Sequence, residues 1–182
     1  MIYLFLANGF EEVEALAPLD LLRRAGQAVT TVAVGGERTV TGSHGISVVA
    51  DMTDTQLADT KDISIDMVIL PGGMPGATNL DASPVVDAML SLAAEQNAYL
   101  CAICAAPLVL GRRGLLEGKS ATCYPGFEHE LMGAVSVGGQ VIRDGNIITA
   151  QGMGAALPFG LELVSVMTSE AVAGQIKDAI KA

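Results

Sequence analysis

Apolar runs recur along the chain, and most of them are followed by a segment with helical features. The clearest runs cover residues 2–7, 29–34, 66–70, 98–103 and 147–150. The predicted helices cover residues 10–25, 84–95, 105–111, 155–167 and 170–180. Apolar strands that alternate with helices are typical of a parallel sheet covered on both faces. We therefore predict a single α/β domain over residues 1–182, with a mostly parallel sheet and helices on both faces.

Weaker signals fill the remaining segments. Short strands are predicted at residues 39–41, 46–49 and 120–123, and a polar loop rich in Asp and Thr runs to about residue 64. The segments 134–137 and 141–143 flank Gly138 and Gly139, which predicts a hairpin across the two glycines.

Charge and composition limit the classes of partner. The net charge is −10, whereas nucleic acids and anionic membranes bind basic surfaces, so neither is an expected partner. The longest uncharged run, residues 96–111, is too short to span a bilayer, and the N-terminus has no basic region typical of a signal peptide. We expect a cytoplasmic protein. Its three cysteines argue against a disulfide framework.

Cys104 stands at the junction between the strand predicted at 98–103 and the helix that follows. The small residues Ala102 and Ala106 lie two positions to either side. A sharp strand-to-helix turn needs small neighbours and holds a nucleophilic side chain up for attack, so the pattern predicts a nucleophile elbow. The helix N-terminus is expected to lower the pKa of the thiol. A buried cysteine in a core strand is the alternative, since free cysteine is often buried.

Glu14 interrupts an apolar helix face. At helical spacing this face consists of Phe10, Glu14, Ala17 and Leu21. A carboxyl on a buried face must be protonated or well bonded, which makes Glu14 a candidate for function. The alternative is that it lies at the edge of the face, or anchors a backbone N–H group. Pro18 removes the helical partner of the Glu14 carbonyl, so a bend is expected there.

In doubly wound sheets, ligands bind at the carboxyl ends of the strands. The segments 8–12 and 71–76 and the turn at Cys104 should therefore meet. Glu11 and Glu12 precede Glu14 in the first helical turn, where acidic side chains usually face solvent.

Gly72 and Gly73 follow a predicted strand and offer backbone N–H groups to an anion or a developing oxyanion. A plain tight turn is the alternative for this glycine pair. No lysine follows as in a phosphate-binding P-loop.

Neither a metal site nor a cofactor is predicted. Cys101 and Cys104 lie three residues apart on an extended strand, where their side chains point to opposite faces. The two histidines, His44 and His129, fall in polar segments where a solvated histidine is the ordinary interpretation.

Four motifs together resemble the ThiJ/PfpI superfamily. They are Glu11-Glu-Val-Glu14, Leu70-Pro-Gly-Gly73 with Gly76, Ala102-Ile-Cys-Ala-Ala-Pro107 and Gln151-Gly-Met-Gly154. The similarity covers nearly the whole chain and is closest to the branch of the Parkinson's-disease protein deglycase and bacterial YajL. It implies a flavodoxin-like three-layer sandwich, a homodimer and no cofactor.

The resemblance also implies a set of site residues. Cys104 would be the reactive cysteine, hydrogen-bonded to a protonated carboxyl of Glu14, with backbone N–H groups of Gly72, Gly73 and Ala105 nearby. The supporting residues that it implies are Glu11, Tyr124 and a polar pair near the dimer contact, Asp20 and Arg24.

Three positions depart from relatives. Ala105 follows the cysteine where protease-like members have a histidine, Tyr124 replaces the histidine of human-type members, and His44 replaces an arginine. A hydrolase or amidase mechanism is therefore disfavoured. A role in thiamine thiazole-phosphate biosynthesis is also disfavoured, because no phosphate-binding motif is present.

Two functions share this predicted site. The first is a cysteine-dependent glyoxalase or protein deglycase, in which Cys104 attacks a small carbonyl substrate or a glycated side chain. Glu14 would then shuttle the proton of the resulting hemithioacetal between carbon and oxygen. The second is a chaperone-like protein of oxidative stress, in which Cys104 is oxidised to the sulfenate and sulfinate.

Overall fold

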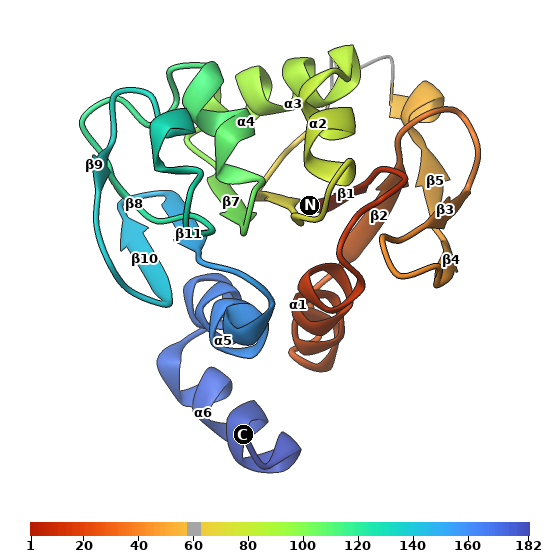
Figure 1. Ribbon diagram of the computed structural model, residues 1–182. Helices are drawn as coiled ribbons and strands as arrows, with labels where there is room; N and C mark the ends of the chain where they lie inside the picture. The colour runs from red at the N-terminus through yellow and green to blue at the C-terminus, as the bar shows by residue number, and fades with distance from the viewer. Residues whose placement is uncertain (58–62) are drawn as a thin grey trace.

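A seven-stranded sheet forms the centre of the molecule in the computed structural model, which describes residues 1–57 and 63–182 (Figure 1). Its order is β10-β11-β7-β6-β1-β2-β5, and all neighbouring strands are parallel except β10 and β11. The strands are β1 (Ile2–Leu6), β2 (Val29–Ala33), β5 (Met52–Thr53), β6 (Met67–Leu70), β7 (Tyr99–Ile103), β10 (Val141–Asp144) and β11 (Ile147–Ala150). The predicted mostly parallel sheet is confirmed.

Helices cover both faces of this sheet. Figure 1 shows α2 (Gly76–Asp81), α3 (Pro84–Glu95) and α4 (Pro107–Arg112) on one side. On the other side lie α1 (Glu12–Arg24), α5 (Ala156–Met167) and α6 (Glu170–Ile180). Two separate clusters of buried apolar side chains fill the layers above and below the sheet. The predicted flavodoxin-like three-layer sandwich is therefore confirmed.

The predicted hairpin across Gly138 and Gly139 is wrong. β9 (Val135–Ser136) instead pairs in parallel with β8 (Ser120–Ala121), and β10 turns back onto β11. The turn contains Gly145, whose φ is +63°. The sequence offers two glycine turns, one at Gly138 and Gly139 and one at Gly145. The hairpin forms at Gly145, which places β10 at the edge of the main sheet.

Smaller elements complete the fold. They are a hairpin of β3 (Thr39–Thr41) and β4 (Ser47–Val49), and 3₁₀ helices at Asp54–Leu57, Glu128–Glu130 and Met153–Ala155. The polar loop expected to about residue 64 includes residues 58–62, which lie outside the described part of the chain.

The helix that carries Glu14 packs tightly on α5. At Gly160 of α5, a Cβ atom would lie 2.6 Å from Leu21 Cδ1 and 2.9 Å from Pro18 Cα, both of α1. Only glycine therefore permits this approach. The helix α1 continues through Pro18 without a break, so the expected bend does not divide it. This contact sets the position of the helix that presents Glu14 to the sheet.

Candidate active site

Cys104 lies in a strained turn between β7 and α4. Its φ is +64°, in the left-handed region that residues with a Cβ rarely adopt. Its backbone N–H donates to the Ala150 carbonyl at 2.9 Å, and its carbonyl accepts from Tyr124 N–H at 2.8 Å. Bonds from two other segments therefore hold the strained backbone in place. The small neighbours Ala102 and Ala106 are fully buried.

The strain predicts an order of stability among variants. Cys104→Gly should be about 0.5–1 kcal/mol more stable to unfolding than Cys104→Ala, because glycine adopts positive φ freely and this gain exceeds its entropic disadvantage. Chemical denaturation of both variants checks this. An alanine variant that is the more stable of the two would show that the turn carries no strain.

Glu14 lies next to this turn, inside the protein. The residue is 1% exposed, its Oε2 accepts the Gly72 N–H at 3.0 Å, and its carboxylate accepts the Cys104 thiol. Burial raises the pKa of Glu14 to about 7, and the negative charge of Glu11 adds to this, whereas the hydrogen bonds from Cys104 and Gly72 oppose it. The carboxyl therefore exchanges its proton near neutral pH.

The expected lowering of the Cys104 pKa is not found. Burial, followed by the charge of Glu14 and its hydrogen bond, raises the pKa of the thiol to about 12. The Gly73 and Ala105 N–H groups donate to the sulfur and oppose this rise, but they are outweighed. Because α4 begins only at Pro107, its first turn lies three residues beyond the sulfur. Cys104 and Glu14 consequently titrate as a pair.

The two glycines after β6 leave room for this pair. A Cβ atom on Gly72 would lie 2.6 Å from both Cys104 Cβ and Glu14 Oε2. A Cβ atom on Gly73, whose φ is +85°, would lie 2.4 Å from the backbone nitrogen of Glu11. Both positions therefore require glycine. At Gly72 the reason is the close approach of Cys104 and Glu14, and not a tight turn alone.

Glu11 joins the start of α1 to this glycine turn. Its side chain caps the helix by accepting the Glu14 N–H at 2.7 Å, and its own N–H donates to the Gly72 carbonyl at 2.9 Å. The segments 8–12 and 71–76 thus meet beside Cys104.

Glu12 has a structural role that the sequence analysis missed. It was expected to face solvent, but it is 4% exposed. Its carboxylate accepts the backbone N–H and the ring Nδ1 of His44, each at 2.8 Å, and more weakly the Ile46 N–H. Burial alone would raise the pKa of Glu12, but these hydrogen bonds, led by that of His44, lower it to about 2. Glu12 therefore fastens the β3–β4 hairpin to α1.

This contact predicts an acid-dependent loss of stability. The Glu12 pKa is lower in the folded protein than its ordinary value of 4.5, so its stabilisation is present above pH 4.5 and disappears as the pH falls toward about 2. Glu12→Gln should reduce the free energy of unfolding at neutral pH by about 1–3 kcal/mol and flatten its dependence on pH below 4.5. Urea denaturation across this range checks the result, with the exposed Glu37→Gln as control. An unchanged acid dependence would contradict it.

A family model described as "DJ-1/PfpI family" matches residues 1–166. The chain belongs to the DJ-1/PfpI family. The "Parkinson disease protein 7 homolog" of Danio rerio is 36% identical over 176 residues, which cover 94% of this chain and 92% of the relative. The "Glutathione-independent glyoxalase DJ-1" of Schizosaccharomyces pombe is 30% identical over 174 residues, 92% of this chain and 91% of the relative. The structure named "Toxoplasma gondii DJ-1, oxidized" has a TM-score of 0.93 and 33% identity, covering 98% of this chain and 96% of that one. The family resemblance found from the sequence motifs is confirmed.

Besides Glu11, the resemblance implied three supporting residues in this DJ-1/PfpI chain: Tyr124, Asp20 and Arg24. Tyr124 is 51% exposed, and its backbone contacts the Cys104 turn. Asp20 and Arg24 form an ion pair of 2.6 Å on the exposed surface of α1. The two side chains contact each other. Their expected role near a dimer contact stays a prediction.

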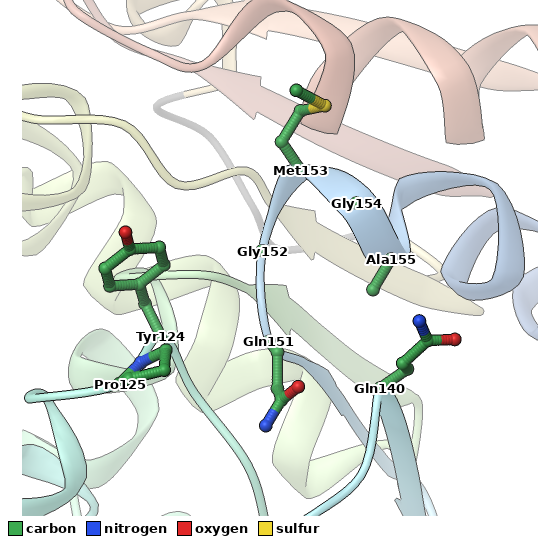
Figure 2. Close-up of a pocket in the computed structure, with 8 residues that line it drawn as sticks. All are labelled: Tyr124, Pro125, Gln140, Gln151, Gly152, Met153, Gly154 and Ala155. Carbon is green, nitrogen blue, oxygen red and sulfur yellow. The ribbon is translucent and has the colours of Figure 1, made fainter.

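A cavity of about 300 Å³ adjoins the Cys104 turn. Figure 2 shows the eight residues that line it, with the Tyr124 ring on one side of the segment around Gly152 and the Gln140 amide on the other. Cys104 and Glu14 are not among the lining residues. Glu14 lies near the cavity at Gly152, where a Cβ atom would lie 3.2 Å from the Tyr124 ring and 3.9 Å from Glu14 Oε1.

One group of side chains has ligand atoms close enough for a metal ion. Within residues 1–57 and 63–182, these are Glu11, Glu12 and His44, with ligand atoms within 4.8 Å of one another. The Glu12 oxygens already accept hydrogen bonds from the hairpin, which accounts for the cluster without an ion. In the same described part, the helices are too short or too polar to cross a membrane.

Proposed function

We propose that the protein is a cofactor-independent glyoxalase or deglycase that acts on reactive dicarbonyls or their adducts with side chains. The observation that carries this is the buried Glu14 carboxyl hydrogen-bonded to the Cys104 thiol in a strained turn. A nucleophile paired with a proton acceptor of pKa about 7 suits a reaction that moves protons at neutral pH. The name of the Schizosaccharomyces pombe relative, a glutathione-independent glyoxalase, supports the same chemistry.

The first step is the attack of the Cys104 sulfur on the aldehyde carbon of methylglyoxal. The thiol proton passes to Glu14 as the carbon–sulfur bond forms, and Glu14 then delivers this proton to the aldehyde oxygen, which becomes the hydroxyl of a hemithioacetal. Glu14 is left ionised. Because Glu14 accepts the thiol proton, the raised pKa of Cys104 does not prevent attack. The N–H groups of Gly73 and Ala105, which donate to the sulfur, are placed to stabilise charge that develops beside it.

The second step is an internal proton transfer. The ionised Glu14 takes the proton from the former aldehyde carbon and delivers it to the neighbouring carbonyl oxygen, which gives an enediol. Glu14 then takes the proton of the hydroxyl on the sulfur-bearing carbon and delivers it to the neighbouring carbon, which leaves a lactoyl thioester on Cys104. Water hydrolyses this thioester, releases lactate and restores the thiol. The overall reaction adds one water to methylglyoxal and needs no external oxidant or reductant.

Lactate formation from methylglyoxal by the purified protein tests the proposal. The wild type should form lactate, Cys104→Ala should lose at least about 99% of the activity, and Cys101→Ala should retain it. Cys101 is a matched control, because it lies on β7 and is fully buried. An inactive wild type, or an active Cys104→Ala variant, would overturn the assignment.

A redox-sensing, chaperone-like role in oxidative stress is the second candidate. It is favoured by the partial exposure of Cys104 and by the Gly73 and Ala105 N–H groups, which could hold sulfinate oxygens. The relative from Toxoplasma gondii has a structure described as oxidized. Intact mass after mild peroxide treatment tests this role: Cys104 should gain one and then two oxygens while Cys101 and Cys123 remain unchanged. Oxidation of the other two thiols before Cys104 would contradict it.

We also propose that the protein forms a homodimer through α1 and the β3–β4 hairpin. Val13 of α1, Ile46 and Val49 are exposed apolar side chains on these two neighbouring elements, which Glu12 holds together. Light scattering after gel filtration should give twice the mass of the chain, 18.7 kDa. Val49→Glu should shift it to the monomer, and a wild-type monomer at micromolar concentration would refute the dimer.

A further inference from the structure

The cavity beside Cys104 has more room than a three-carbon dicarbonyl uses. Its volume is about 300 Å³, which corresponds to about ten molecules of liquid water at ~30 Å³ each. It also reaches the lower end of the range for pockets that bind drug-sized ligands, about 300–1,000 Å³. The single methyl group of methylglyoxal would leave most of this space to water.

The cavity lies beside Glu14 of the reacting pair. Gly152 belongs to its lining and has no side chain, and the position of a Cβ atom there would be 3.9 Å from Glu14 Oε1. Tyr124, on the same lining, is bonded through its backbone to the Cys104 carbonyl. The cavity and the reacting pair therefore share Gly152 and Tyr124 as neighbours.

The lining is polar but carries no ionised side chain. Gln140 and Gln151 contribute primary amides, each with two N–H donors and one acceptor, and Tyr124 contributes a phenol. The remaining lining residues offer backbone or apolar groups. An anionic substituent would meet no cation among these residues, in a protein of net charge −10.

We infer that this cavity binds the substituent of the substrate, and that the preferred substrates are uncharged 2-oxoaldehydes with a substituent much larger than methyl. The inference rests on the proposed function and specifies its substrate class. Gln140 and Gln151 bind polar atoms of the substituent, and the absence of a cation excludes 2-oxoaldehydes that carry a carboxylate or phosphate.

Three probes separate size from charge: methylglyoxal, phenylglyoxal and 4-carboxyphenylglyoxal. The products are lactate, mandelate and 4-carboxymandelate, and each rate is corrected with Cys104→Ala. The wild type should have a kcat/KM for phenylglyoxal at least 10-fold above that for the carboxylated analogue. Gly154→Val adds a side chain at a lining position where a Cβ atom meets nothing within 4 Å. It should lower the ratio of kcat/KM for phenylglyoxal over methylglyoxal at least 10-fold.

Charge is tested by placing a cation in the lining. Gln151→Lys should raise the ratio of kcat/KM for 4-carboxyphenylglyoxal over phenylglyoxal at least 10-fold. The control Gln175→Lys adds the same charge on α6, outside the lining, and should leave the ratio unchanged. Methylglyoxal activity that is present but accompanied by equal rates on the two aromatic probes, or by equal effects of both lysine variants, would overturn the inference alone. Absence of all activity that depends on Cys104 would overturn the proposed function, and the inference with it.

Discussion

Glu14→Gln should lower kcat/KM for methylglyoxal by at least about 100-fold, while the protein remains folded. The amide keeps the shape of the side chain but cannot accept the thiol proton or return a proton to carbon. Lactate formation measured from pH 5 to 9 checks this, with Glu95→Gln at the exposed end of α3 as control. Activity within 3-fold of the wild type would remove Glu14 from the mechanism.

The same variant should be more stable than the wild type at high pH. The pKa of Glu14 is about 7 in the folded protein, above its ordinary value of 4.5, so the folded state holds the proton more tightly. Its favourable contribution is complete below pH 4.5 and disappears as the pH rises through about 7. The free energy of unfolding of the wild type should therefore fall over this window relative to Glu14→Gln. Parallel curves for the two proteins would show that the carboxyl is not buried in solution.

Gly72→Ala is expected to abolish activity and to destabilise the protein by about 1–3 kcal/mol. The new methyl group would occupy the space between Cys104 and Glu14, 2.6 Å from an atom of each and 2.9 Å from the Ile103 carbonyl. The pair must separate to admit it. Lactate formation and urea denaturation measure the two effects.

Gly174→Ala provides the matched control for this substitution. Gly174 lies inside α6, and a Cβ atom there meets nothing within 4 Å. Alanine should therefore raise stability by about 0.5–1 kcal/mol through its helix propensity and leave activity unchanged. If both variants behaved alike, the close approach at Gly72 would not be a constraint in solution.

The layered fold could be predicted because its strands are buried on both sides. Residues 2–6 and 67–70 are entirely buried, and this is why they appear in the sequence as unbroken apolar runs. The helix α2 was missed because it has only six residues, among them Gly76 and Asn79, which are weak helix formers. The hairpin was predicted at the wrong turn because both Gly138-Gly139 and Gly145 are suitable for one. The local sequence does not distinguish between these two turns.

The central pair of the candidate site, Cys104 and Glu14, could also be predicted from the sequence, but its electrostatics could not. The small residues around Cys104 and the acidic residue on an apolar face identified the pair, because both are local patterns. The direction of the Cys104 pKa depended on burial and on the charge of Glu14, which only the folded chain brings together. Glu12 was missed because its partner, His44, lies far along the chain. The available signals were the acidic run at residues 11–14 and the glycine-rich segment around His44, which the sequence does not connect.

The hydrogen bond from Cys104 N–H to the Ala150 carbonyl has a consequence for biosynthesis. A chain growing from its N-terminus on the ribosome exposes the thiol well before β11 has been translated. Until that strand docks beside β7, the turn lacks one of the two bonds that hold it. The bonds that hold the turn are therefore complete only after the last strand of the sheet has been translated and has paired with β7.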